Sequence, residues 1–290
     1  MVYGELCEMS KAPVFTGISE LRTYLDSHGP GKSLGFVPTM GALHQGHLDL
    51  VARSSQENEL TIVSIYVNPI QFGPNEDFSK YPRPLSDDIA KLSPFNCIVF
   101  TPSDEEMTLG INDYSFHPRR LGQIWEGESR PTHFDGVCKI VMKLFQVVRP
   151  TRAYFGEKDF QQFVIIQDMA RTFAVPVEVV PCPTIRESDG LAMSSRNRYL
   201  STEERKFAAE ISKNLRKVCD AFYQNPKMSG SELVTLGHQL FTNTPEIKLD
   251  YLAIVDEVRL TEVTEKITPG NRIIVAVRIG TTRLIDNVAV

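Results

Sequence analysis

The first two-thirds of the chain alternate short, continuous apolar runs with stretches of helical periodicity, and this alternation constrains the fold most. The apolar runs are the strand candidates 33–37, 60–67, 97–100, 153–155 and 177–180. Strands that are apolar throughout are buried on both faces, and intervening helices make such strands parallel. We therefore predict a parallel α/β sheet covered by helices, with ligands bound at the carboxyl ends of its strands.

Helical periodicity fills the intervals between these strands. Apolar residues recur three and four positions apart in the stretches 46–52, 85–92, 134–148 and 163–169. Pro150 follows the third stretch and ends that helix.

The pattern changes after the Pro181-Cys182-Pro183 break. A polar loop follows, and then Ser201 and Ser229 each open a capping box with glutamate three residues later, which marks two helix starts. The last strand candidates are 251–255, 272–279 and 283–288. We predict two domains, a Rossmann-like nucleotide- and substrate-binding domain over 1–183 and a smaller α+β domain over 184–290.

Composition limits the classes of function. With 42% hydrophobic residues the chain can form a real core, and its net charge of −5 argues against a broad nucleic-acid surface. The longest apolar run, 273–277, is too short to span a bilayer, and no signal peptide is recognisable. The five cysteines are widely spaced without a CxxC pair, so we expect reduced thiols. We expect a cytoplasmic protein that binds neither nucleic acid nor membrane.

The string P-T-M-G-A-L-H-Q-G-H, residues 38–47, joins the first predicted strand to a helix. Gly41 and Gly46 let the backbone approach a ligand, and a helix start is a natural phosphate site. His44 and His47 can then contact a triphosphate and donate protons or hydrogen bonds as charge builds on phosphorus. The alternatives are two ordinary loop histidines or a metal site, although zinc needs a third ligand and H-E-x-x-H is absent.

Polar residues also follow two other predicted strands. Gln71 offers a donor and an acceptor, which suits a small hydroxy acid, although a simple strand-end turn explains it equally. In the segment 155–162, Gly156 permits close approach, Lys158 offers charge to a phosphate and Asp159 can accept from ribose hydroxyls. A solvated helix start has a similar composition.

The loop 186–200 contains two hydroxyls and a guanidinium, in Ser194, Ser195 and Arg196. Such a loop can close on a triphosphate and exclude water, whereas an ordinary polar linker is the plain alternative. The presence of all four segments in one chain favours a functional site over four unrelated turns and linkers. From the residues alone we predict an ATP-dependent adenylating enzyme.

The 38–47 string resembles the HxGH motif of the nucleotidyltransferase superfamily and, in this expanded form, the pantoate–β-alanine ligase family. The other three segments match the same family in the same order, and the similarity extends over residues 33–287. The resemblance implies that pantoate attacks ATP to give pantoyl adenylate and pyrophosphate, and that β-alanine then displaces AMP to form pantothenate. It also implies Mg²⁺ accompanying ATP, and a homodimer.

The resemblance assigns roles by position. The catalytic residues it implies are His44, His47, Lys158, Ser194, Ser195 and Arg196. The ATP contacts it implies are Met40, Gly41, Ala42, Leu43, His44, Gln45, Gly46, His47, Gly156, Glu157, Lys158, Asp159, Ile185, Met193, Ser194, Ser195 and Arg196. The pantoate contacts are Pro38, Met40, Gln71 and Gln162, with Gln71 also near the β-alanine site, and Asp88 is a candidate magnesium ligand. Thr132 stands where the family more often has glycine; Arg130 and His133 are expected to shape the pocket without belonging to the catalytic set.

Two other functions stay open. A related nucleotidyltransferase could transfer AMP to a phosphate acceptor without an amine step, and an RNA-binding module could keep the fold without catalysis. The pair Gln71 and Gln162 argues against the first, and the acidic balance of charge argues against the second.

Overall fold

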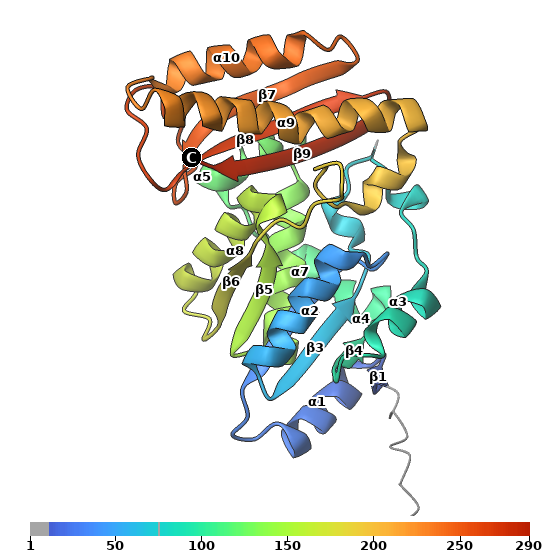
Figure 1. Ribbon diagram of the computed structural model, residues 1–290. Helices are drawn as coiled ribbons and strands as arrows, with labels where there is room; N and C mark the ends of the chain where they lie inside the picture. Colours follow the sequence, from blue (N-terminus) through green and yellow to red (C-terminus); the bar gives the residue numbers. More distant parts are fainter. Residues whose placement is uncertain (1–11, 75) are drawn as a thin grey trace, which may run out of the picture.

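The computed structural model describes residues 12–74 and 76–290, so Cys7 and the first eleven residues, which the sequence predicts to be irregular, lie outside it. A six-stranded sheet forms the lower half of Figure 1, in the order β1-β4-β3-β2-β5-β6, and its neighbouring strands are all parallel. Its strands are β1 (Val14–Phe15), β2 (Leu34–Thr39), β3 (Leu60–Ile65), β4 (Ile98–Phe100), β5 (Arg152–Gly156) and β6 (Glu178–Cys182). The predicted parallel sheet is confirmed.

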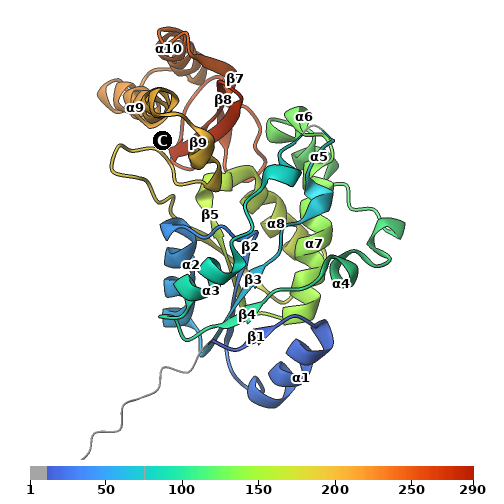
Figure 2. The ribbon, with the colours of Figure 1, turned by 90° about the vertical axis from the view of Figure 1, so that its right-hand side faces the viewer.

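Helices cover both faces of this sheet, with α2 and α3 on one side and α7 on the other (Figure 2). The helices are α1 (Ile18–His28), α2 (Gln45–Glu57), α3 (Leu85–Leu92), α4 (Asp104–Thr108), α5 (Arg119–Gly122), α6 (Glu126–Ser129), α7 (His133–Val148) and α8 (Phe160–Thr172). Short 3-10 turns are η1 (Pro69–Gln71), η2 (Phe78–Lys80), η3 (Ile111–Asp113), η4 (Glu157–Asp159) and η5 (Ser195–Tyr199).

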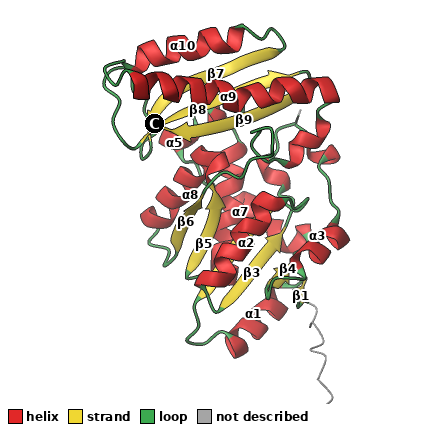
Figure 3. Ribbon diagram, in the orientation of Figure 1, coloured by secondary structure: helices red, strands yellow, loops and turns green. Residues whose placement is uncertain are grey.

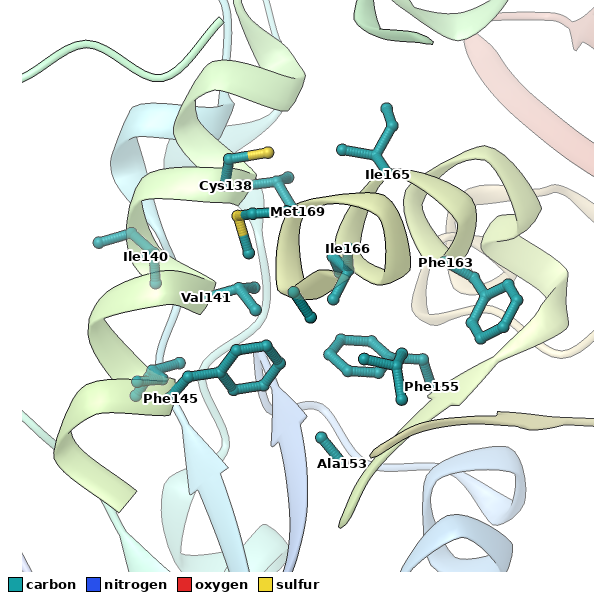
Figure 4. Packing of buried hydrophobic residues seen from close by; sticks show 14 of the residues in the cluster. Cys138, Ile140, Val141, Phe145, Ala153, Phe155, Phe163, Ile165, Ile166 and Met169 are labelled. Atoms are coloured by element: carbon teal, nitrogen blue, oxygen red, sulfur yellow. The ribbon is translucent and has the colours of Figure 1, made fainter. Parts of the chain in front are cut away.

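Successive residues of the central strands pack on opposite faces, which explains their continuous apolar runs. Phe36 and Ile62 pack toward α1, α7 and α8, whereas Val37 and Val63 pack toward α2 and α3. Figure 4 shows the first of these cores, where Phe145 of α7 meets Phe155 of β5 at a ring-centroid distance of 6.4 Å. The sheet is thus a rigid platform for the loops at its carboxyl edge.

A second, three-stranded antiparallel sheet lies above the first and carries two long helices (Figure 3). Its elements are α9 (Thr202–Gln224), α10 (Gly230–Thr242), β7 (Ile247–Asp256), β8 (Asn271–Ile279) and β9 (Thr282–Ala289). Both predicted capping boxes are present, since Ser201 and Glu204 exchange hydrogen bonds and so do Ser229 and Glu232. The proposed division after residue 183 falls directly behind β6.

The two sheets share buried surface. Ile254 and Val275 pack under α9 and α10, whereas Ala253, Val255 and Ile274 join the core of the parallel sheet. The predicted elements are all found, with ends displaced by a few residues, but β1, α1 and the short helices α4–α6 were not predicted.

Four of the cysteines, Cys97, Cys138, Cys182 and Cys219, are buried and free, as expected for core thiols. Within residues 12–74 and 76–290, no helix has the length and apolar character needed to cross a membrane.

Candidate active site

The topology brings three of the predicted segments to one edge of the parallel sheet. The strand order reverses between the neighbours β2 and β5, because β3 lies beyond β2 and β6 lies beyond β5. Loops at the carboxyl ends diverge at such a point and leave a crevice for ligands. The histidine loop follows β2, Gln71 follows β3, and Lys158 follows β5. The crevice therefore collects residues that are far apart in the sequence.

A cavity of about 240 Å³ occupies this crevice. The predicted residues that line it are Pro38, Met40, His44, Gly46, His47, Gln71, Gly156, Lys158, Asp159, Gln162, Ile185, Met193, Ser194, Ser195 and Arg196. All residues predicted to be catalytic or to contact pantoate therefore line this one cavity.

Other predicted contacts lie behind this wall or outside it. Ala42 and Leu43 are buried, and their backbone N–H groups each donate to Asp88 at 2.7 Å. Gln45 is exposed and bonds Asp49. Glu157 faces the second sheet, where Arg272 reaches it.

Asp88 is 1% exposed, and each of its carboxylate oxygens accepts one of the two hydrogen bonds from the histidine loop. This geometry favours a role in holding that loop rather than in binding magnesium. Lys91, one turn further along α3, donates to the carbonyl of Leu43 at 2.7 Å and braces the same loop.

The rings of the two motif histidines pack against each other at the start of α2, with centroids 4.0 Å apart and planes tilted by 35°. Nδ1 of His47 accepts from the backbone N–H of His44 at 3.3 Å, so the proton of a neutral His47 ring lies on Nε2. Burial and the neighbouring His44 lower the pKa of His47 to about 3, and burial and Lys158 lower the pKa of His44 to about 4. Both rings are therefore neutral near pH 7, and His47 offers a hydrogen-bond donor.

Gly46 leaves room for the His44 ring. A Cβ at this position would lie 3.0 Å from Cε1 and 3.1 Å from Nδ1 of the His44 ring. A larger residue at position 46 would therefore make the His44 ring shift by a few tenths of an ångström.

The 3-10 turn η4 places the ammonium group of Lys158 in the wall of the cavity. The ammonium of Lys158 lies 3.8 Å from a carboxylate oxygen of Asp159. Burial would raise the pKa of Asp159, but the charges of Lys158 and Arg196 hold it below its usual value. Lys158 and Asp159 thus present an ammonium and an ionised carboxylate side by side, which suits a phosphate and a ribose hydroxyl.

The loop of the second domain closes onto the histidine loop. The hydroxyl of Ser195 donates to the carbonyl of Ala42 at 3.2 Å. Arg196 makes a bidentate pair with Asp77, through Nε at 3.0 Å and Nη2 at 2.8 Å. Nη1 of Arg196 is thereby the atom that can turn to a further partner.

A polar corner on the other side of the cavity surrounds Gln71. Asn68 donates to its side-chain oxygen at 3.0 Å, and the Gln71 amide reaches the sulfur of Met40 at 3.1 Å. The backbone of η1 approaches α7 so closely that a Cβ on Gly136 would lie 2.6 Å from the backbone of Ile70 and Gln71. Gly136 therefore sets the depth of this corner.

His133 and Arg130 complete the wall, as expected from the resemblance. Nε2 of His133 faces Nη1 of Arg130 at 3.1 Å, and since arginine only donates, the Nδ1–H of His133 donates to the Gln71 carbonyl at 2.9 Å. Burial and Arg130 lower the pKa of His133 to about 4. This neutral ring supports the main chain that carries Gln71.

Sequence reasoning missed the acidic partners of these arginines. Glu76 pairs with Arg130 at 2.5 and 3.0 Å, next to the pair of Asp77 with Arg196. No local pattern marks Glu76 or Asp77, because each partner is far along the chain.

A larger cavity of about 740 Å³ adjoins the first and lies between the two sheets. Lys158, Gln162 and Arg196 belong to both walls, and β9 contributes Asp286 and Asn287 to the larger one. The site is therefore open toward the second domain, whose sheet forms part of its lining.

Comparison with known proteins identifies the family. The family model described as pantoate-beta-alanine ligase matches residues 13–289. A pantothenate synthetase of Pseudothermotoga lettingae is 46% identical over 94% of this chain and 97% of its own length. The crystal structure of pantothenate synthetase from Thermus thermophilus has a TM-score of 0.89 and 43% identity, covering 95% of this chain and 98% of its own.

A third similar structure carries ligands. The pantoate-beta-alanine ligase from Francisella tularensis, complexed with beta-gamma ATP and beta-alanine, has a TM-score of 0.75 and 33% identity over 96% of this chain and 97% of its own. With the family model matching nearly the whole chain, this protein belongs to the pantoate–β-alanine ligase family.

Proposed function

We propose that this protein condenses pantoate with β-alanine at the expense of ATP, through a pantoyl-adenylate intermediate, and releases pyrophosphate and AMP. Family membership supports the overall reaction, and the Francisella relative was crystallised with an ATP compound and β-alanine. The observation that carries the proposal is the convergence of His47, Lys158 and Arg196, from three separate segments, on one cavity of about 240 Å³.

In the first step a pantoate carboxylate oxygen attacks the α-phosphorus of ATP, the bond to the β-phosphate oxygen breaks, and pyrophosphate leaves. Negative charge grows on the phosphate oxygens, so fixed donors lower the barrier. We assign the Nε2–H of His47, the ammonium of Lys158 and Nη1 of Arg196 to these oxygens. His44, neutral and packed against His47, adds a second imidazole to the same face of the cavity.

In the second step the amine of β-alanine attacks the acyl carbon, the carbon–oxygen bond to AMP breaks, and the amine loses a proton. The mixed anhydride must be protected from water until then. The loop holding Ser194, Ser195 and Arg196 covers the cavity from the second domain, which suits this task. Gln71 and Gln162, with Pro38 and Met40, are the groups we assign to pantoate.

Magnesium enters this proposal only as the counter-ion of ATP. Residues 12–74 and 76–290 contain no group of three histidine, cysteine or acidic side chains placed to hold a metal ion. Asp88 is buried and each of its carboxylate oxygens accepts a backbone hydrogen bond, so we assign it to holding the histidine loop. The homodimer and the cytoplasmic location stay predictions.

The test is the release of pyrophosphate and AMP from ATP and magnesium, with pantoate alone and then with pantoate and β-alanine. We expect pyrophosphate with pantoate alone, limited to about one equivalent of enzyme, and sustained AMP only when both substrates are present. Sustained AMP transfer to a phosphate acceptor without the amine would indicate the related nucleotidyltransferase activity instead. Inactivity with every combination, together with tRNA retention on a filter, would indicate the RNA-binding alternative.

A further inference from the structure

Asn287, on the last strand, reaches across to the segment that carries Lys158. Its side-chain Nδ2 donates to the carbonyl of Glu157 at 2.8 Å and to that of Lys158 at 3.0 Å. The residue is 5% exposed, so water does not compete for these carbonyls. The side-chain amide of Asn287, from the second domain, therefore holds the main chain of η4 in the first domain.

The orientation of this amide is fixed by Arg272. Nη1 of Arg272 donates to Oδ1 of Asn287 at 2.7 Å, and since arginine has no acceptor, the amide cannot be reversed. The same guanidinium donates to Glu157 at 3.2 Å and lies 4.0 Å from the ring centre of Phe160. Arg272 and Asn287 thus hold the residues on both sides of Lys158 and Asp159.

The preceding residue, Asp286, holds the other phosphate-binding segment. Its carboxylate, 1% exposed, accepts two hydrogen bonds from Arg186 at 2.7 and 2.9 Å. Arg186 lies in a narrow hairpin, in which Met193 donates to the Ile185 carbonyl at 2.9 Å and Arg186 bridges Ala192. This hairpin leads directly into Ser194, Ser195 and Arg196.

Successive side chains leave a strand in opposite directions, so one strand can grip a segment on each side. We propose that Asp286 and Asn287 are positioning residues which set the separation between Lys158 and the Ser195–Arg196 pair to fit a nucleotide phosphate chain. This inference rests on the proposed function, because it takes these two segments as the phosphate-binding ones. Neither side chain is assigned a contact with substrate.

The test replaces Asn287 by aspartate, which has the same size but cannot donate. Asn287→Asp still accepts from Arg272 but turns a carboxylate oxygen toward two carbonyls, so η4 must move. The matched control is Asn271→Asp: Asn271 is also 5% exposed, and its side-chain oxygen accepts from Thr268, a role that aspartate retains. Thermal unfolding of both variants shows how much of any effect is folding.

We expect Asn287→Asp to lower kcat/KM for ATP in pyrophosphate release by roughly 10- to 100-fold, the effect of displacing a catalytic group by a fraction of an ångström to an ångström. The equilibrium Kd for pantoate, measured without ATP, should stay within about 2-fold of wild type, because Gln71 and Gln162 are not touched. Asn271→Asp should leave both quantities unchanged.

A folded Asn287→Asp protein with wild-type kcat/KM for ATP would overturn the proposal, and so would equal losses of pantoate and ATP binding. If aspartate prevents folding, Asn287→Ala removes the donors without adding charge. The same comparison of kcat/KM for ATP with Kd for pantoate then tests the proposal. Failure of the proposed function can be distinguished from failure of this proposal, because the wild-type enzyme itself would then release no pyrophosphate with ATP and pantoate.

Discussion

The backbone N–H of His44 donates to Nδ1 of His47, at 3.3 Å, and this single bond determines what His47 can do. A neutral ring with Nδ1 as acceptor carries its proton on Nε2. In the proposed reaction His47 would act on the phosphates as a neutral donor, since burial and His44 lower its pKa to about 3. The ring therefore keeps this neutral form at neutral and mildly acidic pH.

The first prediction concerns this tautomer. In ¹⁵N-labelled protein without ligands at pH 7, we expect the ring of His47 to show a protonated Nε2 and an unprotonated Nδ1, assigned by comparison with His47→Gln. The ring signals should not titrate between pH 8 and 5. A titration midpoint near the ordinary histidine pKa of about 6.5 would contradict this account.

Removing the ring tests its role in the chemistry. We expect His47→Ala to slow pyrophosphate formation by roughly 10²- to 10⁴-fold, the range for one positioned proton-transfer or donor group. His47→Gln should lose less, because its amide can place an N–H in the same direction. Single-turnover measurements of pyrophosphate with pantoate and ATP separate this step from AMP release. A rate for the alanine variant within about 2-fold of wild type would remove His47 from the mechanism.

Buried histidines also make stability depend on pH. The pKa of His133 is lowered by burial and by Arg130 to about 4, whereas in the unfolded chain it returns to about 6.5. Between these values the unfolded state binds more protons, so the free energy of unfolding falls as the pH is lowered from 6.5 to 4. Asn can keep the hydrogen bond to the Gln71 carbonyl without titrating. We expect His133→Asn to lose less stability between pH 7 and 4.5 than wild type in urea unfolding, and equal losses would contradict it.

Gly156 allows a test of whether a ligand lies close to the backbone, because its own backbone conformation does not require glycine. Its backbone has φ −72° and ψ 131°, which any residue adopts, and a Cβ there would have no protein atom within 4 Å. Gly156→Ala should therefore keep or raise stability, by about 0.4–1 kcal/mol. If the nucleotide lies against this backbone, KM for ATP should rise by at least about 10-fold.

The control for that experiment is Gly17→Ala, at the start of α1, where a Cβ would make only ordinary contacts of 3.4 Å or more with Glu20. It should leave KM for ATP unchanged. An unchanged KM in Gly156→Ala as well would show that the nucleotide does not approach this strand end.

Much of the fold and of the site follows from local patterns. The apolar runs and the helical spacings predict the strands and long helices, because burial on two faces needs apolar residues throughout. The histidine loop is recognisable because its glycines and histidines are close in sequence, and Gly46 leaves room for the neighbouring His44 ring. Local patterns thus predict the elements and the main polar segments of the cavity wall, whereas contacts such as Ile185, Met193 and Gln162 come from the family resemblance.

What could not be predicted depends on distant pairs or on short segments. The helices α4 to α6 have too few residues to show a period. Helix α1 begins at Ile18 and its N-cap residue, Gly17, has no side chain to cap it, so no start signal marks this helix. Arg196 and Asp77 are 119 residues apart, and Asn287 and Lys158 are 129 apart, so only the folded chain shows that they meet. Long-range polar pairs of this kind have no local signature.

The pair of Asp77 with Arg196 yields the last prediction. Asp77 occupies Nε and Nη2 of the guanidinium, which leaves Nη1 as the atom that can turn to a further partner. Asp77→Asn can accept only one of these bonds, so Arg196 loses its fixed direction. We expect KM for ATP to rise by roughly 5-fold, which corresponds to about 1 kcal/mol for a partly exposed pair. The control is Glu178→Gln, which breaks the exposed pair with Arg152 at the amino ends of β5 and β6. This variant should leave KM for ATP unchanged. A fall in KM for ATP in Asp77→Asn would instead mean that the carboxylate competes with phosphate for Arg196, and the idea that Asp77 orients the guanidinium for ATP would be wrong.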